Sequence, residues 1–403
     1  MFKILCNQIP RVLTVLTIPI ITNKYSFSDI SNDNNNITSK PGLNNMTVLG
    51  GTANQELTKQ VCDILGVKPG EMDVTRFSDG EIHVQINESI RGKDCFIIQT
   101  CAAPVNDNLL ELLLTITAAR RSGAASVTAV IPYYGYKHNR RGLPISSTYH
   151  SRFLWSAASD FAKMLRILGV DKVISVDLQK SGQGHESCFF DNTIPVENIS
   201  SIDSFVDYIN NQLLIDPTNN KKKQITNKLV IVSPNTEYIK KAKKLELLLK
   251  QSHSNRHIDT AVILDNTHTN RLEGNAEIVG DVKDADVIIV DDFIDTATSL
   301  AILCRLLKKE GARRVFICAS HGLFTQTSME LIDLSPVEKV IVTDSVPLPK
   351  GSSNKIVQIS IAPLIAKILE SEAITSNAIW DSERISDDNV KEIDEDDEEF
   401  ELE

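Results

Sequence analysis

Short runs of β-branched residues alternate with stretches of helical periodicity over most of the chain, which leaves few folds open to it. In the first half, the strand-like run Cys95–Gln99 precedes a helical stretch over Asn108–Arg121, and Val127–Ile131 begins the next unit. In the second half, the run Val287–Val290 precedes a helical stretch over Leu300–Glu310. Strands that alternate with helices favour parallel sheets covered by helices. The sequence therefore predicts an α/β protein with two tandem, doubly wound parallel-sheet domains.

Changes in composition at both ends mark the limits of the folded body. We interpret residues 1–45 as an extension and linker, 46–197 as an N-terminal α/β domain and 198–375 as a C-terminal α/β domain. Residues 381–403 hold 13 of the 53 acidic residues but only 2 of the 42 basic ones, so the net charge of −11 belongs to this tail. Its charge density predicts a disordered tail, or alternatively a docking segment for a basic partner. The remaining body is neutral and gives no reason to expect nucleic-acid binding.

The N-terminal extension contains a candidate targeting signal. Val12–Ile21 is apolar and is preceded by Lys3 and Arg11, which is typical of a targeting peptide. The run is interrupted by Pro19, and about ten residues are too few to cross a bilayer. We expect no membrane span and a cytoplasmic protein, with targeting to an organelle as the alternative.

The most informative segment for chemistry is Val287–Ser299, which reads VIIVDDFIDTATS. Backbone N–H groups at the start of a helix, together with small hydroxyl residues, bind phosphate well. Carboxylates at the carboxyl end of a strand lie where open α/β sheets bind ligands, and there they can accept hydrogen bonds from vicinal sugar hydroxyls. The pattern suits a 5-phosphorylated ribose, and the alternative is an ordinary strand-turn-helix with an Asp or Thr cap. The candidate ribose 5-phosphate residues are Asp291, Asp292, Asp295, Thr296, Ala297, Thr298 and Ser299.

This segment resembles the phosphoribosyl-binding motif shared by the phosphoribosyltransferases and the ribose-phosphate pyrophosphokinases. Further motifs resemble the second group only, and they follow one another in the expected order between about Met46 and Leu369. They are Phe77–Glu81 (FSDGE), Glu88–Asp94 (ESIRGKD), Asn106–Leu113 (NDNLLELL), Val127–Tyr136 (VTAVIPYYGY), Val279–Lys283 (VGDVK) and His321–Phe324 (HGLF). The resemblance implies two domains of the phosphoribosyltransferase type.

The resemblance also implies a reaction, that of a ribose-phosphate diphosphokinase in nucleotide biosynthesis. The 1-hydroxyl of ribose 5-phosphate would attack the β-phosphorus of MgATP, releasing AMP and forming 5-phosphoribosyl 1-diphosphate. Mg²⁺ would enter with ATP, and inorganic phosphate is a candidate activator.

Two groups of ATP-binding residues follow from the same resemblance. Phe77, Asp79 and Glu81 would hold the adenine and ribose of ATP and reach the site from a neighbouring subunit. We therefore expect a homo-oligomer built from dimers, up to a hexamer. The residues at the positions of the family's ATP-phosphate contacts are Lys137, His138, Asn139 and Arg140.

The metal segment departs from the family pattern. By resemblance the carboxylates of Asp177, Asp191 and Glu197 would be the Mg²⁺ ligands, because Mg²⁺ prefers oxygen donors. Gln179 replaces the family's histidine, and His185 is the candidate replacement.

Two further departures concern the phosphate loop and the flexible loop. Ser233–Tyr238 reads SPNTEY where the family has Ser-Pro-Asp-Ala-Gly-Gly, which removes a carboxylate and two glycines. The family's catalytic Lys and Arg fall on Asp265–His268, so His268 and Arg271 are the nearest substitute catalytic cations. These losses motivate the alternative of a catalytically silent regulatory subunit or associated protein of the same fold. A phosphoribosyltransferase is a third hypothesis.

Overall fold

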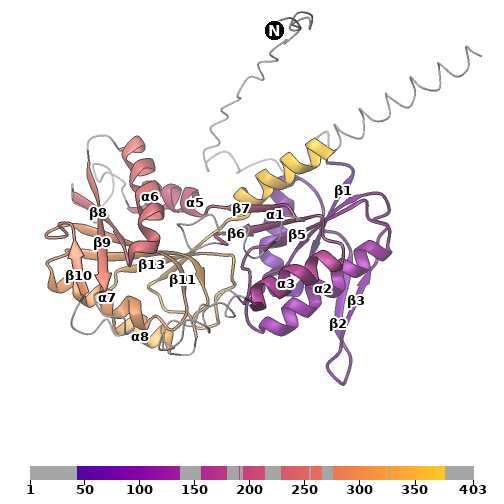
Figure 1. The fold of residues 1–403 in the computed structure, drawn as a ribbon, viewed down its shortest axis with the longest axis horizontal. Coiled ribbons are helices and arrows are strands. Elements are labelled where there is room, and N and C mark those ends of the chain that lie inside the picture. The colour runs from indigo at the N-terminus through magenta and orange to yellow at the C-terminus, as the bar shows by residue number, and fades with distance from the viewer. Residues whose placement is uncertain are drawn as a thin grey trace, which may run out of the picture. The chain divides into compact units, whose positions relative to one another are not determined.

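The computed structural model of the chain describes residues 43–136, 156–178, 190, 194–213, 228–253, 256–265, 276–325 and 327–376 (Figure 1). Residues 1–42 and the acidic tail lie outside these ranges. Eight predicted site residues also lie outside them, namely Lys137, His138, Asn139, Arg140, His185, Asp191, His268 and Arg271.

Five of the described strands form the first sheet, in the spatial order β1-β4-β5-β6-β7, and all neighbours are parallel. The strands are β1 (Met46–Gly50), β4 (Asp94–Ile98), β5 (Ser126–Ile131), β6 (Lys172–Val176) and β7 (Val196–Ile199). The helices of this half are α1 (Gln55–Leu65), α2 (Val105–Arg121) and α3 (Ser156–Ile167). Helices α2 and α3 pack on one face of the sheet and α1 packs on the other.

Seven described strands form the second sheet, in the order β10-β9-β8-β11-β12-β13-β14. They are β8 (Lys228–Ser233), β9 (His257–Asp265), β10 (Ala276–Val279), β11 (Asp286–Ile294), β12 (Arg314–Gly322), β13 (Lys339–Thr343) and β14 (Ile356–Ile359). Only β10 is antiparallel to its neighbour. The strand order reverses between β8 and β11, and ligands of open α/β sheets bind at such a switch point.

Helices cover both faces of the second sheet, as predicted. Helices α5 (Ile202–Tyr208) and α6 (Ile239–Ser252) cover one face, and α7 (Thr298–Lys309) and α8 (Ser328–Leu334) cover the other. Short turns of helix are η1 (Thr52–Asn54), η2 (Ile209–Leu213) and η3 (Thr236–Tyr238). Among the described residues, no helix is both long enough and apolar enough to cross a membrane.

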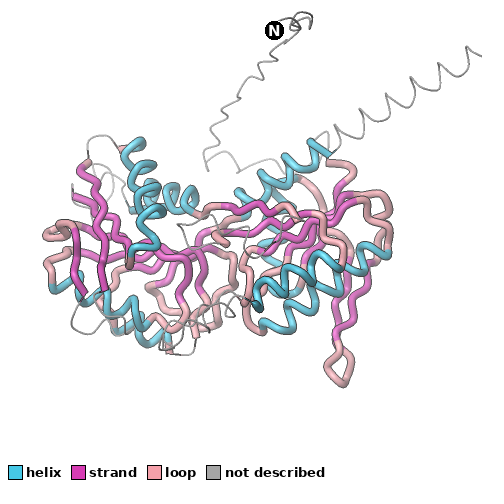
Figure 2. The backbone as a smooth tube through the Cα atoms, viewed as in Figure 1, coloured by secondary structure: helices cyan, strands magenta, loops and turns pink. Residues whose placement is uncertain are grey.

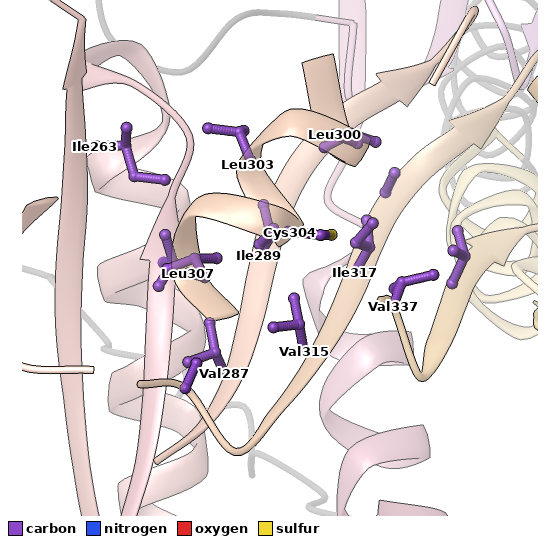
Figure 3. Packing of buried hydrophobic residues seen from close by; sticks show 14 of the residues in the cluster. Ile263, Val287, Ile289, Leu300, Leu303, Cys304, Leu307, Val315, Ile317 and Val337 are labelled. Atoms are coloured by element: carbon purple, nitrogen blue, oxygen red, sulfur yellow. The ribbon is translucent and has the colours of Figure 1, made fainter. Parts of the chain in front are cut away.

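The central strand β11 is buried on both sides, because successive side chains of a strand point to opposite faces. Val287 and Ile289 lie in the core under α7, whereas Ile288 and Val290 lie in the core under α6. Figure 3 shows the α7 side of this packing, to which the helix contributes Leu300, Leu303, Cys304 and Leu307. The apolar run that predicted a buried strand is thereby explained.

The closing helix packs against the first sheet. Residues 362–376 are helical, and Ile365 and Leu369 lie in one buried cluster with Val48 of β1. The helix thus belongs to the core of the first sheet, although the C-terminal domain was predicted to extend over 198–375. An amphipathic pattern shows that a helix has an apolar face but not which sheet that face covers.

A two-stranded antiparallel hairpin, β2 (Met72–Arg76) and β3 (Ile82–Ile86), stands outside both sheets. It packs along α2 and projects from the first half of the molecule (Figure 2). The sequence pattern does not predict these strands, because their side chains alternate only between half-buried and exposed positions.

Candidate active site

The loop between β11 and α7, the predicted phosphate cradle, lies at the switch point of the second sheet. Helix α7 begins at Thr298, and its N-cap residue Ala297 has no side-chain acceptor to cap the first backbone N–H groups. Thr298 and Ser299 are exposed in the first turn. Uncapped N–H groups and the positive end of the helix dipole favour an anion at this position. The alternative of an ordinary Asp or Thr cap is not what the structure shows.

Ala297 is held in the left-handed region, at φ 59°, while its methyl group is buried in the core under α7. A β-branched residue is strongly disfavoured at positive φ, whereas glycine is not. We therefore expect Ala297→Val to lower the free energy of unfolding by about 2 kcal/mol and Ala297→Gly to change it by less than about 1 kcal/mol. Urea unfolding of the two variants checks this, and equal effects would contradict the backbone argument.

The two adjacent carboxylates of β11 have different surroundings and different hydrogen-bond partners. Asp292 is buried and its Oδ1 accepts a hydrogen bond of 2.8 Å from Nζ of Lys241, a residue of α6. Asp291 is half-buried, and its own Oδ1 accepts a hydrogen bond of 2.8 Å from the backbone N–H of Asp292. The strand alternation explains the difference, since Asp292 follows Ile288 and Val290 toward the α6 face.

Lys241 joins Asp292 to a third carboxylate, that of Asp177 at the end of β6. The ammonium lies 3.3 Å from Asp177 Oδ2 and donates to the hydroxyl of Ser320 at 2.7 Å. Ser320 in turn donates to Asp177 Oδ2 at 2.5 Å, and the backbone N–H of Ser201 donates to the same oxygen at 3.2 Å. A buried ionic network therefore connects the carboxyl ends of β6, β11 and β12.

The charges of this network stabilise one another. Burial alone would raise the pKa of Asp177, but the nearby Lys241 ammonium and the hydroxyl groups of Ser201 and Ser320 lower it to about 2. Burial would lower the pKa of Lys241, but Asp177 and Asp292 raise it above its usual value. Asp177 and Lys241 are therefore charged at neutral pH.

Lys241 was missed by sequence reasoning, although a signal was present. Helix α6 buries Ala242, Leu245 and Leu249 on one face, and Lys241 adjoins this apolar stripe. A lysine is rarely fully buried unless it is paired with an acid. A lysine beside the apolar stripe in the first turn of α6 therefore indicated a buried carboxylate partner, which is Asp292 of β11.

The predicted metal carboxylates are not brought together among the described residues. Glu197 of β7 accepts a hydrogen bond of 2.6 Å from Lys172, at the opposite end of β6 from Asp177. The Asp177 carboxylate is already engaged by Lys241. Within the described part of the chain, no group of three or more His, Cys, Asp or Glu residues is placed to hold a metal ion.

The SPNTEY segment forms a compact turn at the end of β8. Asn235 Oδ1 accepts a hydrogen bond of 2.8 Å from the N–H of Glu237, and Tyr238 is buried. The side chain of Tyr238 thus fills core volume at a position where the family pattern has glycine.

Phe77, Asp79 and Glu81 lie in the turn of the β2–β3 hairpin. The N–H of Gly80 donates to the carbonyl of Phe77 at 2.9 Å, and Gly80 has φ 95°. Phe77 is 55% exposed, and its ring lies 5.5 Å between centroids from the ring of His83 in the same hairpin. An exposed aromatic ring with two exposed carboxylates at a projecting tip is available to a partner or ligand.

Two motifs from opposite halves of the sequence meet near the phosphate cradle. Tyr133, at the end of β5, packs edge-on against His321 of β12 with ring centroids 5.0 Å apart. Burial raises the pKa of Tyr133, and the charge of Asp295 in the cradle raises it further. Thr100 Oγ1 also donates to the carbonyl of Ser345 at 2.6 Å. The segments that follow β4 and β5 of the first sheet therefore contact the second sheet at the carboxyl ends of β12 and β13.

Comparisons with known proteins agree with this arrangement. Residues 46–157 match the family model of the N-terminal domain of ribose phosphate pyrophosphokinase, and residues 250–383 match that of the phosphoribosyl synthetase-associated domain. The chain is 36% identical over 329 residues to the ribose-phosphate pyrophosphokinase of Aquifex aeolicus, which covers 81% of this chain and 96% of that protein. The chain belongs to the ribose-phosphate pyrophosphokinase family. The prediction from its motifs is confirmed.

Other relatives support the same assignment. The ribose-phosphate pyrophosphokinase of Campylobacter jejuni is 36% identical over 328 residues, which is 80% of this chain and 94% of that protein. The crystal structure of phosphoribosylpyrophosphate synthetase from Mycobacterium smegmatis superimposes with a TM-score of 0.66 at 30% identity, covering 83% of this chain and 99% of the other. The chain is thus a member of a family of diphosphate-group transferases of nucleotide biosynthesis, with two domains of the phosphoribosyltransferase type. Coverage over nearly the whole length of these relatives favours this family over the phosphoribosyltransferase hypothesis.

Proposed function

We propose that this chain transfers the diphosphoryl group of MgATP to the 1-hydroxyl of ribose 5-phosphate. The 1-oxygen forms a bond to the β-phosphorus, the bond from that phosphorus to the oxygen bridging the α- and β-phosphates breaks, and AMP leaves with the bridging oxygen. The hydroxyl proton is released, and 5-phosphoribosyl 1-diphosphate is the second product. Such phosphoryl chemistry depends on alignment and on neutralisation of charge.

The single observation that carries this proposal is the uncapped start of α7 at Thr298, one short loop after the strand that carries Asp291 and Asp292. The 5-phosphate would accept hydrogen bonds from the N–H groups of Thr298 and Ser299, and Asp291 would accept from the ribose hydroxyls. Asp295, Thr296 and the backbone of Ala297 would complete the loop around the sugar phosphate. The location at the switch point of the sheet supports the same assignment.

The ATP side of the proposed site is the hairpin tip. Phe77 would stack on adenine, and Asp79 and Glu81 would accept hydrogen bonds from the nucleoside. Because this tip projects from the first half of the molecule, we propose that it completes the site of a second copy in a homo-oligomer. Mg²⁺ would enter bound to the phosphates of ATP as part of the substrate.

A second candidate, a regulatory subunit that binds ligands without turnover, is favoured by the SPNTEY turn. Asn235 supplies no carboxylate, and the buried Tyr238 stands in for a glycine of the family pattern. A loop of this kind cannot bring its backbone as close to a phosphate group.

The full chain, incubated with ribose 5-phosphate, MgATP and inorganic phosphate, is expected to release AMP and 5-phosphoribosyl 1-diphosphate in equal amounts. Chromatographic measurement of both products checks the stoichiometry. AMP without the second product would indicate ATP hydrolysis instead. Binding of ribose 5-phosphate without any AMP release would establish the regulatory subunit in place of the enzyme.

A further inference from the structure

The buried ammonium of Lys241 is the centre of the charge network at the ribose side of the second sheet. Its hydrogen-bond partners come from three strand ends: Asp292 Oδ1 at 2.8 Å, Ser320 Oγ at 2.7 Å, and Asp177 Oδ2 and the Asp291 carbonyl oxygen at 3.3 Å each. An ammonium has three donors, so these acceptors account for all of them. The direction of the Lys241 side chain is thereby determined.

Lys241 also controls the peptide group between Asp291 and Asp292. The carbonyl oxygen of that peptide accepts from Lys241 Nζ, and its N–H donates to the carboxylate of Asp291 at 2.8 Å. Both polar ends of one peptide plane are therefore held, one by the lysine and one by the half-buried carboxylate. Rotation of this plane would turn the Asp291 carboxylate away from its present direction.

The charge balance assigns a role to Asp177. Its side chain lies in the same buried network as Asp292, and its Oδ2 accepts from Ser201, Ser320 and Lys241. One ammonium thus faces two buried carboxylates, and the serine donors supply the additional stabilisation that burial of the second carboxylate requires. The Oδ2 oxygen, which accepts from three residues, has little capacity left for a metal ion.

We propose that Lys241 is a positioning residue for ribose 5-phosphate, acting through Asp292 and the Asp291–Asp292 peptide, and that Asp177 is its second counter-ion and not a Mg²⁺ ligand. This inference rests on the proposed function, because it assumes that the end of β11 binds the ribose hydroxyls. Lys241 touches no substrate in this arrangement. Its effect is to hold the two neighbouring carboxylates in one orientation before the sugar arrives.

The test measures ribose 5-phosphate and ATP affinities separately, by calorimetry on the full-length protein and its variants. Lys241→Met is expected to weaken ribose 5-phosphate binding at least about tenfold, because a charged hydrogen bond is lost, and to leave ATP affinity within about twofold. Ser320→Ala keeps every charge and removes only the hydroxyl that accepts from Lys241 and donates to Asp177, so it is expected to act in the same direction with a smaller effect. Lys244→Met, an exposed position on the same helix, is the matched control and is expected to change neither affinity.

The outcomes distinguish this inference from the proposed function. If the unaltered chain binds ATP but no ribose 5-phosphate, both the proposed function and the inference are overturned. If it binds ribose 5-phosphate and the variants at Lys241 and Ser320 bind it equally well, only the inference is overturned. Ser320→Ala decides the matter should Lys241→Met fail to fold.

The role assigned to Asp177 is tested separately, by measuring Mn²⁺ affinity with electron paramagnetic resonance. Asp177→Asn is expected to bind Mn²⁺, in the presence of ATP, within about twofold of the unaltered chain, because the carboxylate serves Lys241. A tenfold loss of Mn²⁺ affinity in a folded variant would make Asp177 a metal ligand and overturn the counter-ion assignment.

Discussion

Replacing Lys241 with methionine is expected to lower the free energy of unfolding by about 3–5 kcal/mol. The methionine side chain has nearly the same length, so the change removes the charge and creates little space. Asp177 and Asp292 would then be buried without their common cation, and both are less than a tenth exposed. Urea unfolding followed by circular dichroism measures the loss.

A matched variant separates charge burial from a general effect on α6. Lys244→Met removes an exposed lysine of the same helix and is expected to change the free energy of unfolding by less than about 0.5 kcal/mol. Adding Asp292→Asn to Lys241→Met is expected to recover part of the lost stability, because one uncompensated charge disappears. A Lys241→Met effect below about 1 kcal/mol would show that the network contributes far less than its burial indicates.

A carboxylate introduced at the start of α7 is expected to weaken ribose 5-phosphate binding by at least about an order of magnitude. In Thr298→Asp the new charge would lie about 5 Å from a doubly charged phosphate, and their repulsion is about 1.7 kcal/mol even at the dielectric constant of water. That energy corresponds to a loss of about 15-fold, and the lower dielectric constant near the protein surface increases it. Calorimetric titration with ribose 5-phosphate measures the change.

The same variant carries its own control for folding. An acidic residue in the first turn of a helix is stabilising by about 0.3–1 kcal/mol, so Thr298→Asp is expected to unfold no more easily than the unaltered chain. Thr298→Asn introduces a side chain of the same shape as aspartate but without its charge. It is expected to keep most of the affinity for ribose 5-phosphate. Undiminished ribose 5-phosphate binding in the aspartate variant would remove α7 from the site.

Much of the fold was predictable from local patterns. The β-branched run in β11 and the spacing of Leu300, Leu303 and Leu307 in α7 predicted a strand and a helix that the structure confirms. These patterns depend only on neighbours in the chain, through the periods of strand and helix. The β2–β3 hairpin was not predicted, because neither face of it is deeply buried and its alternation is weak.

The placement of the closing helix shows where local patterns stop being sufficient. The sequence predicted a helix near its end, yet Ile365 and Leu369 cover the first sheet, more than 300 residues back along the chain at Val48. Many apolar faces within one molecule have the same periodicity. The choice among them is made by the complete arrangement of strands.

Some features of the candidate site could likewise be predicted from the sequence, and others depend on the tertiary structure. The sequence by itself determined the family, the strand-turn-helix after β11 and the identity of its adjacent acids Asp291 and Asp292. Only the tertiary structure decided that Asp292 pairs with Lys241, 51 residues earlier in the chain, and that Asp177 shares this lysine. The physical reason is that strand alternation sends neighbouring side chains to opposite faces, while the order of the strands and the helix covering each face determine which charges they meet.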